Sequence, residues 1–266
     1  MAAGRIHVGI GGWAYAPWRG TFYPEGLRQA DELAYVAARL TATEVNATFY
    51  GRQKPETFEK WAKAVPDGFR FALKASRYCT NRRVLAEAGE SIGRFLDQGL
   101  VRLEDRLGPI LWQLADSKAF DAEDIARFLG LLPPSHDGVP LAHAIEPRHQ
   151  SFSDPHFIDL ARDHGVAIVV ADHASRPQIA DVTAGFVYAR LQAASEDEPD
   201  GYAPRALDRW ARIAREWSEG GQPDGLAVAA PAAPAPRGSR DVFVFMINGA
   251  KVRAPAAAQA LIGRLG

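Results

Sequence analysis

The 266-residue chain has very little cysteine and no long apolar segment. Its one cysteine, Cys79, excludes an internal disulfide bond and a zinc site built mainly from cysteines. The longest apolar run, VAIVVA at residues 166–171, is far too short to cross a bilayer. The opening residues carry no apolar export signal after Arg5. We therefore expect a cytoplasmic protein without a membrane partner.

An excess of charge of either sign is also missing, because the formal net charge is -1. This balance gives no broad basic surface for nucleic acid, although it is compatible with a locally basic cleft. Hydrophobic residues make up 47% of the chain and charged residues 24%, close to the average for soluble globular proteins. The composition therefore permits nucleic acid as a partner without favouring it, and it leaves the oligomeric state open.

Short apolar runs recur along the chain, and most are followed by apolar residues spaced three and four apart. This alternation is typical of βα units arranged around a parallel sheet. Strands are predicted at 7–11, 43–47, 69–75, 109–114, 141–146, 166–172, 185–191 and 241–248. Helices are predicted at 31–40, 55–65, 121–132, 154–165 and 204–217. Because a closed barrel of eight such units takes roughly 250 residues, we expect an α/β fold, one TIM (β/α)8 barrel domain over residues 1–266.

Two stretches interrupt this pattern. Only residues 173–184 separate the sixth and seventh strands, so we expect the helix between them to be reduced or missing. Residues 221–240 are rich in alanine and proline and cannot supply a periodic buried face, which predicts a surface excursion before the last strand. Elsewhere the helical pattern is well delimited, since Asp31, Asp121 and Asp154 occupy positions where a helix N-cap is expected.

Polar or charged side chains occur at the ends of seven of the eight predicted strands. In a parallel barrel, catalytic and binding groups come from the carboxyl ends of the strands and the loops that follow. A charge at such a barrel mouth loses water, so it must be paired or used. We therefore expect these side chains to converge there. They are Glu44, Asn46, Lys74, Gln113, Glu146, Arg148, His149, Asp172, Arg190 and Asn248.

The acids and bases among them favour an anionic substrate, phosphate-bearing or similar to a sugar phosphate. Arg148 and Arg190 carry planar forks suited to phosphate or carboxylate. Lys74 has three interpretations, a Schiff-base amine, an anion-binding ammonium or simply an ion-pair partner. Nearby carboxylates favour its charged form, so we expect it to bind an anion. Glu44 and Glu146 are then candidates for the general acid and base.

Other residues complete the expected site. Trp13 follows two glycines that permit the close approach of a ligand, so we expect it to contact the substrate. Asn46, Gln113, His149 and Asn248 are the remaining candidate binding residues. The alternative to a site is an ion-pair lattice that closes the barrel and catalyses nothing.

A metal site is a weaker possibility. Glu44, Glu146, Asp172 and His149 have the chemistry to ligate a divalent ion. Against this, only one histidine is predicted at a strand end, and the neighbouring lysine and arginines would repel a cation. We expect no cofactor and no metal, with Asp172 as a further catalytic carboxylate. A metal-dependent phosphodiesterase or nuclease, and a non-catalytic ligand sensor, are the alternatives.

Several segments together resemble the YecE-like family, also called the domain of unknown function 72. They are VGIGGWAYAPWRGTFYPEGL, ATEVNATFYGRQKPETFEKWAKAVPDGFRFALKASR, LGPILWQL, AIEPRHQSF and FVYARL. The resemblance implies a TIM barrel and leaves the activity open. The chain departs from the family pattern at Gly11 and Gly12, where Thr-Ser-Gly-Trp is usual, and at Gln192, where His is usual.

Overall fold

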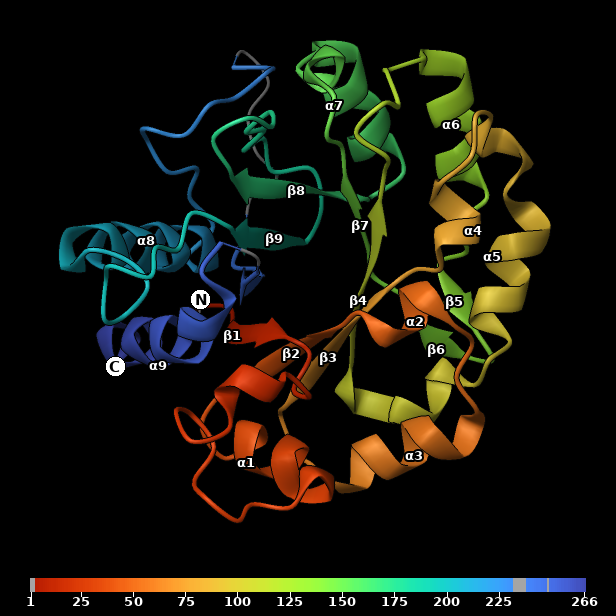
Figure 1. Ribbon diagram of the computed structural model, residues 1–266. Coiled ribbons are helices and arrows are strands. Elements are labelled where there is room, and N and C mark those ends of the chain that lie inside the picture. Colours follow the sequence, from red (N-terminus) through yellow and green to blue (C-terminus); the bar gives the residue numbers. More distant parts are fainter. Residues whose placement is uncertain (1–2, 232–237, 248) are drawn as a thin grey trace.

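A computed structural model describes residues 3–231, 238–247 and 249–266. Eight parallel strands close into a barrel in the order β1, β10, β9, β8, β7, β4, β3, β2 (Figure 1). The TIM-barrel prediction is thus confirmed, and every predicted strand range overlaps an observed one. The barrel strands are β1 (Ile6–Gly11), β2 (Ala42–Val45), β3 (Arg70–Lys74), β4 (Leu107–Gln113), β7 (His143–Glu146), β8 (Ala167–Asp172), β9 (Phe186–Leu191) and β10 (Asp241–Met246).

Helices surround the barrel (Figure 1). The five predicted helices are present as α1 (Glu32–Ala37), α3 (Pro55–Lys63), α6 (Ala122–Gly130), α7 (Pro155–Asp163) and α8 (Pro204–Ser218). The sequence did not predict α2 (Ala47–Tyr50), α4 (Arg77–Thr80), α5 (Gly89–Leu96), α9 (Ala254–Leu265) or the hairpin β5 (Ser135–His136) with β6 (Val139–Pro140). Of these, α2, α4 and the two hairpin strands have only two to four residues each, too few to show a period, whereas α5 and α9 are longer. Across the described residues, no helix has the length and apolarity needed to span a membrane.

The predicted N-caps differ in what their side chains do. Asp121 accepts a hydrogen bond from the backbone N–H of Asp124 at 3.0 Å, and Asp154 accepts one from that of His156 at 2.8 Å. Asp31 lies at the predicted position but makes no capping bond. A 3-10 turn runs directly into α1 there, so Asp31 already has helical dihedral angles and its carboxylate binds Arg28 instead.

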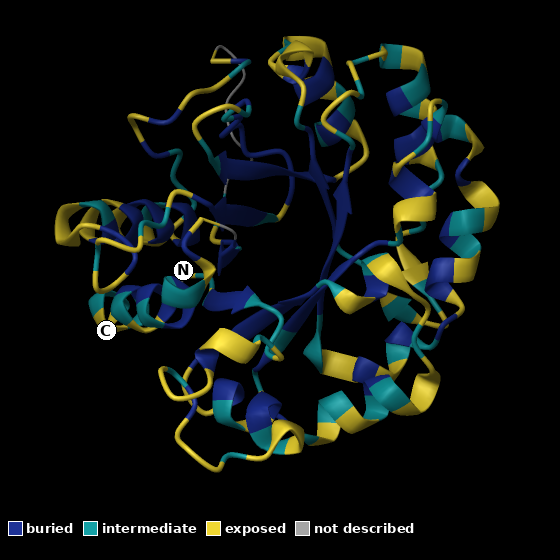
Figure 2. Cartoon of the chain, viewed as in Figure 1, coloured by how far each residue is buried: buried dark blue, intermediate teal, exposed yellow. Residues whose placement is uncertain are grey.

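The interior of the barrel is packed by matching small side chains with large ones. Alanines from β2, β3, β7 and β8 face aromatic rings from β9 and β10, which leaves no room for an open channel. The strands are buried along their length, whereas the helices expose their outer faces (Figure 2). The residues of this interior packing include Ala42, Ala72, Ala144, Ala167, Tyr188, Phe243 and Phe245.

The connection between β8 and β9 contains no helix, as predicted. The buried carboxylate of Asp181 accepts hydrogen bonds from the backbone N–H groups of Ala229 and Ala230, at 2.7 and 2.9 Å. These bonds tie the connection to the described start of the excursion predicted at 221–240, which has no helix or strand of its own. The rest of that excursion includes 232–237, which lie outside the described residues.

Filling the barrel interior should destabilise the protein. In an Ala144→Leu variant, the larger side chain enters an interior that is already packed, at a cost of roughly 1–3 kcal/mol. Urea denaturation should show this loss. The matched control is Ala34→Leu on the exposed surface of α1, which should change the unfolding free energy little. Equal stability of the two variants would contradict the packing described here.

Candidate functional site

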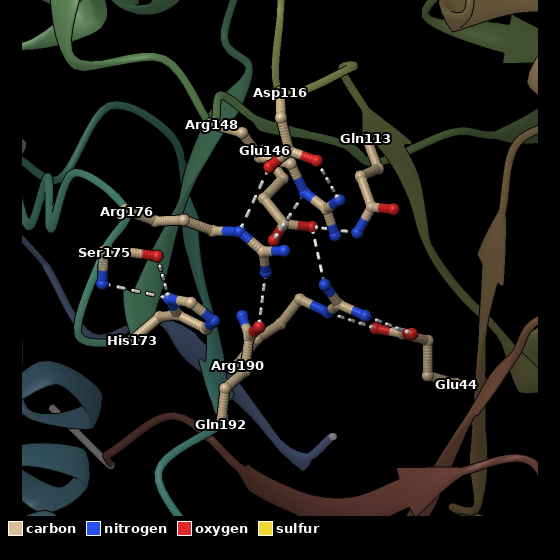
Figure 3. Close-up of polar contacts among 10 residues, drawn as sticks. All are labelled: Glu44, Gln113, Asp116, Glu146, Arg148, His173, Ser175, Arg176, Arg190 and Gln192. Atoms are coloured by element: carbon tan, nitrogen blue, oxygen red, sulfur yellow. Dashed lines mark hydrogen bonds and ion pairs between the residues drawn. The ribbon is translucent and has the colours of Figure 1, made fainter. Parts of the chain in front are cut away.

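Charged side chains from four different strands meet at the carboxyl end of the barrel. Side chains alternate between the two faces of a strand, so Ala42 and Glu44 share the inward face of β2, and Ala144 and Glu146 share that of β7. Arg190 reaches the same point from β9 (Figure 3). The predicted convergence of these residues is therefore observed.

Arg190 lies between two fully buried carboxylates. It donates from Nε and Nη2 to the two oxygens of Glu44, both at 3.0 Å, and from Nη1 to Oε2 of Glu146 at 2.7 Å. Burial opposes the charge of Arg190, but Glu146 and Glu44 outweigh it and raise its pKa. One guanidinium thus satisfies two acids with charge-assisted, partly bidentate hydrogen bonds.

Two neutral groups complete the bonding of Glu44. The hydroxyl of Tyr188 donates to Oε2 at 2.8 Å, and Asn46 donates from Nδ2 to Oε1 at 3.2 Å. Burial raises the pKa of Tyr188 well above its usual value, so the hydroxyl keeps its proton as a donor. Both oxygens of Glu44 are therefore occupied by protein donors.

Glu146 is bonded less completely. Gln113 donates to Oε2 at 2.5 Å, the same oxygen that accepts from Arg190. The other oxygen, Oε1, is buried without a hydrogen bond and lies 3.7 Å from Nε of Arg148, which also has none among the described residues. Burial would raise the pKa of Glu146, but Arg190 and Arg148 outweigh it and lower the pKa to about 2. Glu146 is consequently an ionised acceptor with one free oxygen.

A second layer of polar side chains, three charged groups and one amide, lies next to Glu146 on the segments that follow β4, β7, β8 and β9 (Figure 3). Arg148 donates to Oδ2 of Asp116 at 3.3 Å, and Nε of Arg176 lies 3.5 Å from Oδ1 of the same carboxylate. Arg176 also donates to Oε1 of Gln192 at 2.6 Å. Asp116 thereby links two arginines at the solvent side of the cluster.

Lys74 completes the charged cluster from the inward face of β3. Its ammonium lies 4.0 Å from the centre of the Phe49 ring, and no hydrogen bond or ion pair to it is found in the described chain. The side chain is buried, at 7% exposure. Burial and the nearby Arg190 lower the pKa of Lys74 to about 8, against the opposing charges of Glu44 and Glu146. With a pKa of about 8, the charged form that we expected still predominates at pH 7.

Trp13 and His149 lie apart from this cluster. Gly12 has a φ of 72°, and this left-handed residue turns the chain out of the alternation of β1. The Trp13 ring then packs edge-on against Trp61 on the outer side of the barrel, with 5.2 Å between ring centroids. His149 is exposed, and its ring accepts a hydrogen bond from the backbone N–H of Ser151.

Asp172 also lies outside the cluster, because its side chain is on the outer face of β8 and not on the face that lines the barrel. Ala171 of β8 pairs with Arg190 of β9, and its neighbour Val170 packs on the outer side of the barrel. Side chains alternate along a strand, so Asp172, two residues after Val170, also lies on the outer side. Its carboxylate accepts from the hydroxyl of Tyr202 at 3.3 Å, and burial raises its pKa. Asn248 is outside the described residues.

Sequence reasoning missed several members of the cluster. Tyr188 and Gln192 share the parity of Arg190, so the period-two pattern contained the signal for both. Asp116 and Arg176 lie in loops, where no sequence period indicates direction. The full set of missed residues is Asp116, Arg176, Tyr188 and Gln192.

Metal ligands are not grouped in this cluster. Among the residues that the structure describes, no three or more His, Cys, Asp or Glu side chains are placed to hold one ion. The two buried carboxylates instead share a guanidinium. The donor set therefore suits an anionic or hydroxylated ligand better than a cation.

The fold and the cluster define a TIM-barrel protein with a charged site at the carboxyl ends of its strands. The family model for "Protein of unknown function DUF72" matches residues 7–266, and the chain belongs to that family, as the resemblance implied. UPF0759 protein YecE of Escherichia coli (strain K12) is 25% identical over 148 residues, 55% of this chain. The match spans 50% of that relative's length.

Solved structures share the whole fold. A DUF72 family protein from Enterococcus faecalis V583 has a TM-score of 0.70 at 19% identity, covering 98% of this chain and 95% of its own. One from Thermotoga maritima MSB8 has a TM-score of 0.69 at 22% identity, covering 97% of both chains. The crystal structure of SacUVDE covers 98% of both, with a TM-score of 0.55 at 11% identity. At these identities the likeness shows the fold alone.

Removing the bridging guanidinium should be costly. An Arg190→Met variant leaves Glu44 and Glu146 buried without their shared counter-charge, which should lower the unfolding free energy by roughly 3–5 kcal/mol. Chemical denaturation at neutral pH measures the loss. Arg28→Met is the control, because Arg28 forms an exposed ion pair with Asp31. If the two variants were equally stable, the Arg190 network would not support the fold.

Proposed function

We propose that the barrel mouth is an enzyme site for a small anionic substrate that also carries hydroxyl groups, such as a sugar phosphate. The observation that carries this proposal is the buried, hydrogen-bond-free ammonium of Lys74. Beside it are two further unsatisfied groups, Oε1 of Glu146 and Nε of Arg148. Oε1 of Glu146 and Nε of Arg148 form an ion pair at 3.7 Å but are buried without hydrogen bonds, whereas buried polar groups normally have hydrogen-bond partners. These two groups, beside an ammonium to which the described residues supply no ion-pair partner, indicate a place for a ligand.

The charge of the cluster supports an anion. Its basic residues outnumber its carboxylates by one when Lys74 is protonated, so a negative ligand group would bring the mouth close to neutrality. Arg148 supplies a planar fork for phosphate or carboxylate, and a lysine ammonium adds a point charge. The residues counted are Lys74, Arg148, Arg176 and Arg190 against Glu44, Asp116 and Glu146.

Lys74 is the group that we assign to proton transfer. A pKa of about 8 leaves roughly a tenfold excess of the charged form at pH 7, so the ammonium can donate a proton to an oxygen that gains charge, and the amine can take it back. Glu146, with a pKa of about 2, stays ionised and cannot donate a proton near neutrality. In this proposal its Oε1, which is buried beside Arg148 without a hydrogen bond, accepts a hydrogen bond from a substrate hydroxyl. The roles that the sequence suggested for the carboxylates are therefore reassigned.

Glu44 has a positioning role in this proposal. Both of its oxygens accept hydrogen bonds from Arg190, Tyr188 and Asn46, which leaves no oxygen available to the substrate. It holds the guanidinium of Arg190, and Arg190 in turn holds Glu146. The anion, the hydroxyl and the transferred proton are then handled by Arg148, Glu146 and Lys74. A hydrolase or lyase reaction fits this set of groups.

The activity itself can be tested with a library of sugar phosphates and hydroxy acids, followed by phosphorus-31 or proton NMR. A substrate that is turned over should lose at least about 100-fold in rate in the Lys74→Met variant, because the proton donor is gone. Lys54→Met is the control, since Lys54 is exposed on the outside of the barrel. Binding without any turnover would support a ligand sensor instead of an enzyme.

The titration of Lys74 can be measured directly. After reductive methylation with carbon-13 formaldehyde, the Lys74 resonance should move with a midpoint near pH 8, because burial and Arg190 disfavour the charged amine. Added inorganic phosphate should raise the Lys74 midpoint by stabilising the charged form. A Lys74 midpoint near 10, or one insensitive to phosphate, would contradict the proposal.

A further inference from the structure

A hollow beside the barrel mouth, here called the arginine hollow, is lined by basic residues and by no acidic residue. Its volume is about 520 Å3, within the range of small-molecule sites. Its walls come from α2, α4, α5 and the segments next to them, which lie together in Figure 1. Ten residues line it, and among them are Arg52, Arg82 and Arg94 but no aspartate or glutamate.

Two of these arginines keep an uncompensated charge. Arg52 donates to the backbone carbonyl of Asp97 at 3.0 Å. Arg82 donates to the carbonyl of Tyr78 and to the hydroxyl of Ser91, each at 3.1 Å, so all of these acceptors are neutral. No ion pair to either guanidinium is found in the described parts of the chain. The third arginine, Arg94, forms an ion pair with Glu90 at 2.5 Å. Neutral acceptors hold Arg52 and Arg82 in place without cancelling their charge, so these two guanidinium groups favour a negative ligand.

A neighbouring hollow shows the ordinary arrangement. There Lys118 and Arg83 share the walls with Asp121 and Asp124, and Lys118 forms an ion pair with Asp124 at 2.5 Å. Basic residues in that hollow are thus neutralised by the protein itself. The arginine hollow has no acidic residue in its walls, and this contrast indicates that a ligand supplies the negative charge there.

An exposed aromatic ring lies at the same hollow. Tyr78 lines it and is 64% exposed, although large aromatic side chains are usually more deeply buried. Phe95 adds a buried apolar surface, and Ser76 and Ser91 add hydroxyl groups. The guanidinium of Arg77 lies over this ring at 5.4 Å from its centre. An exposed ring beside the guanidinium groups of Arg52 and Arg82 suits a ligand that joins a planar ring to a phosphate.

We propose that this hollow binds a nucleoside monophosphate or a similar phosphate ester of a planar ring, with the phosphate at Arg52 and Arg82 and the ring against Tyr78. The site is separate from the barrel mouth, and the proposal does not depend on the proposed function. The two are adjacent, because Thr48 lines the hollow and donates to the carbonyl of Lys74 at 2.7 Å.

Calorimetric titration of the full chain with AMP tests the proposal. AMP should bind, and adenosine should bind at least about tenfold more weakly because it lacks the charged group. Arg52→Gln should weaken AMP binding by about tenfold, and Tyr78→Ala by at least about fivefold through the lost ring contact. Both side chains are exposed, so both variants should keep the wild-type melting temperature.

Lys74→Met is the matched control, because it disables the barrel mouth and should leave AMP affinity unchanged. In the reverse control, Arg52→Gln should leave the phosphate response of the Lys74 resonance intact. These two measurements separate failure of this site from failure of the proposed function. The proposal is overturned if AMP does not bind, if adenosine or inorganic phosphate binds to the Lys74→Met variant as tightly as AMP does, or if AMP affinity depends on Lys74 and not on Arg52 and Tyr78.

Discussion

The bridge from Arg190 to Glu44 and Glu146 is the interaction on which the mouth of this barrel depends. Two carboxylates with no exposed surface would each cost several kcal/mol if they were left without a counter-charge. One planar guanidinium reaches both, and Tyr188, Asn46 and Gln113 supply the remaining neutral donors. The alanines below keep the interior narrow enough for side chains from opposite strands to touch. Small residues at the centre and paired charges at the rim are therefore parts of one packing solution.

This bridge also decides which groups are left for chemistry. Both oxygens of Glu44 accept hydrogen bonds from protein donors, so none is left for a substrate. Glu146 is held ionised, so it does not exchange a proton easily near neutral pH. Lys74 belongs to the same cluster but not to its hydrogen bonds, and its pKa moves toward neutrality because burial and a like charge both disfavour the ammonium. A buried network of strong pairs can thus make the one unpaired member its most reactive group.

The family and the fold are established for this chain, but a TIM barrel hosts many chemistries and does not by itself name a reaction. The function of this chain therefore depends on particular atoms. They are the open oxygen of Glu146, the free ammonium of Lys74, and the guanidinium groups of Arg52 and Arg82 that face only neutral acceptors. In both places the described residues leave a charge without an ion-pair partner, and in both of our proposals a phosphate group supplies that partner.

The barrel could be predicted from the amino-acid sequence alone, because the alternation of apolar runs and helical patterns is a local property of the chain. The sequence also placed Glu44, Lys74, Glu146 and Arg190 at one rim, since period-two spacing and parallel strands force their ends together. It did not show which face of its strand the Asp172 side chain occupies, because a shift of one residue exchanges the inner and outer faces. Nor did it show where Trp13 points, because the left-handed Gly12 turns the chain and carries Trp13 outward. Asp116 and Arg176 join the cluster from loops. Only tertiary packing decided those positions, because contacts between segments distant in sequence set where a loop side chain points.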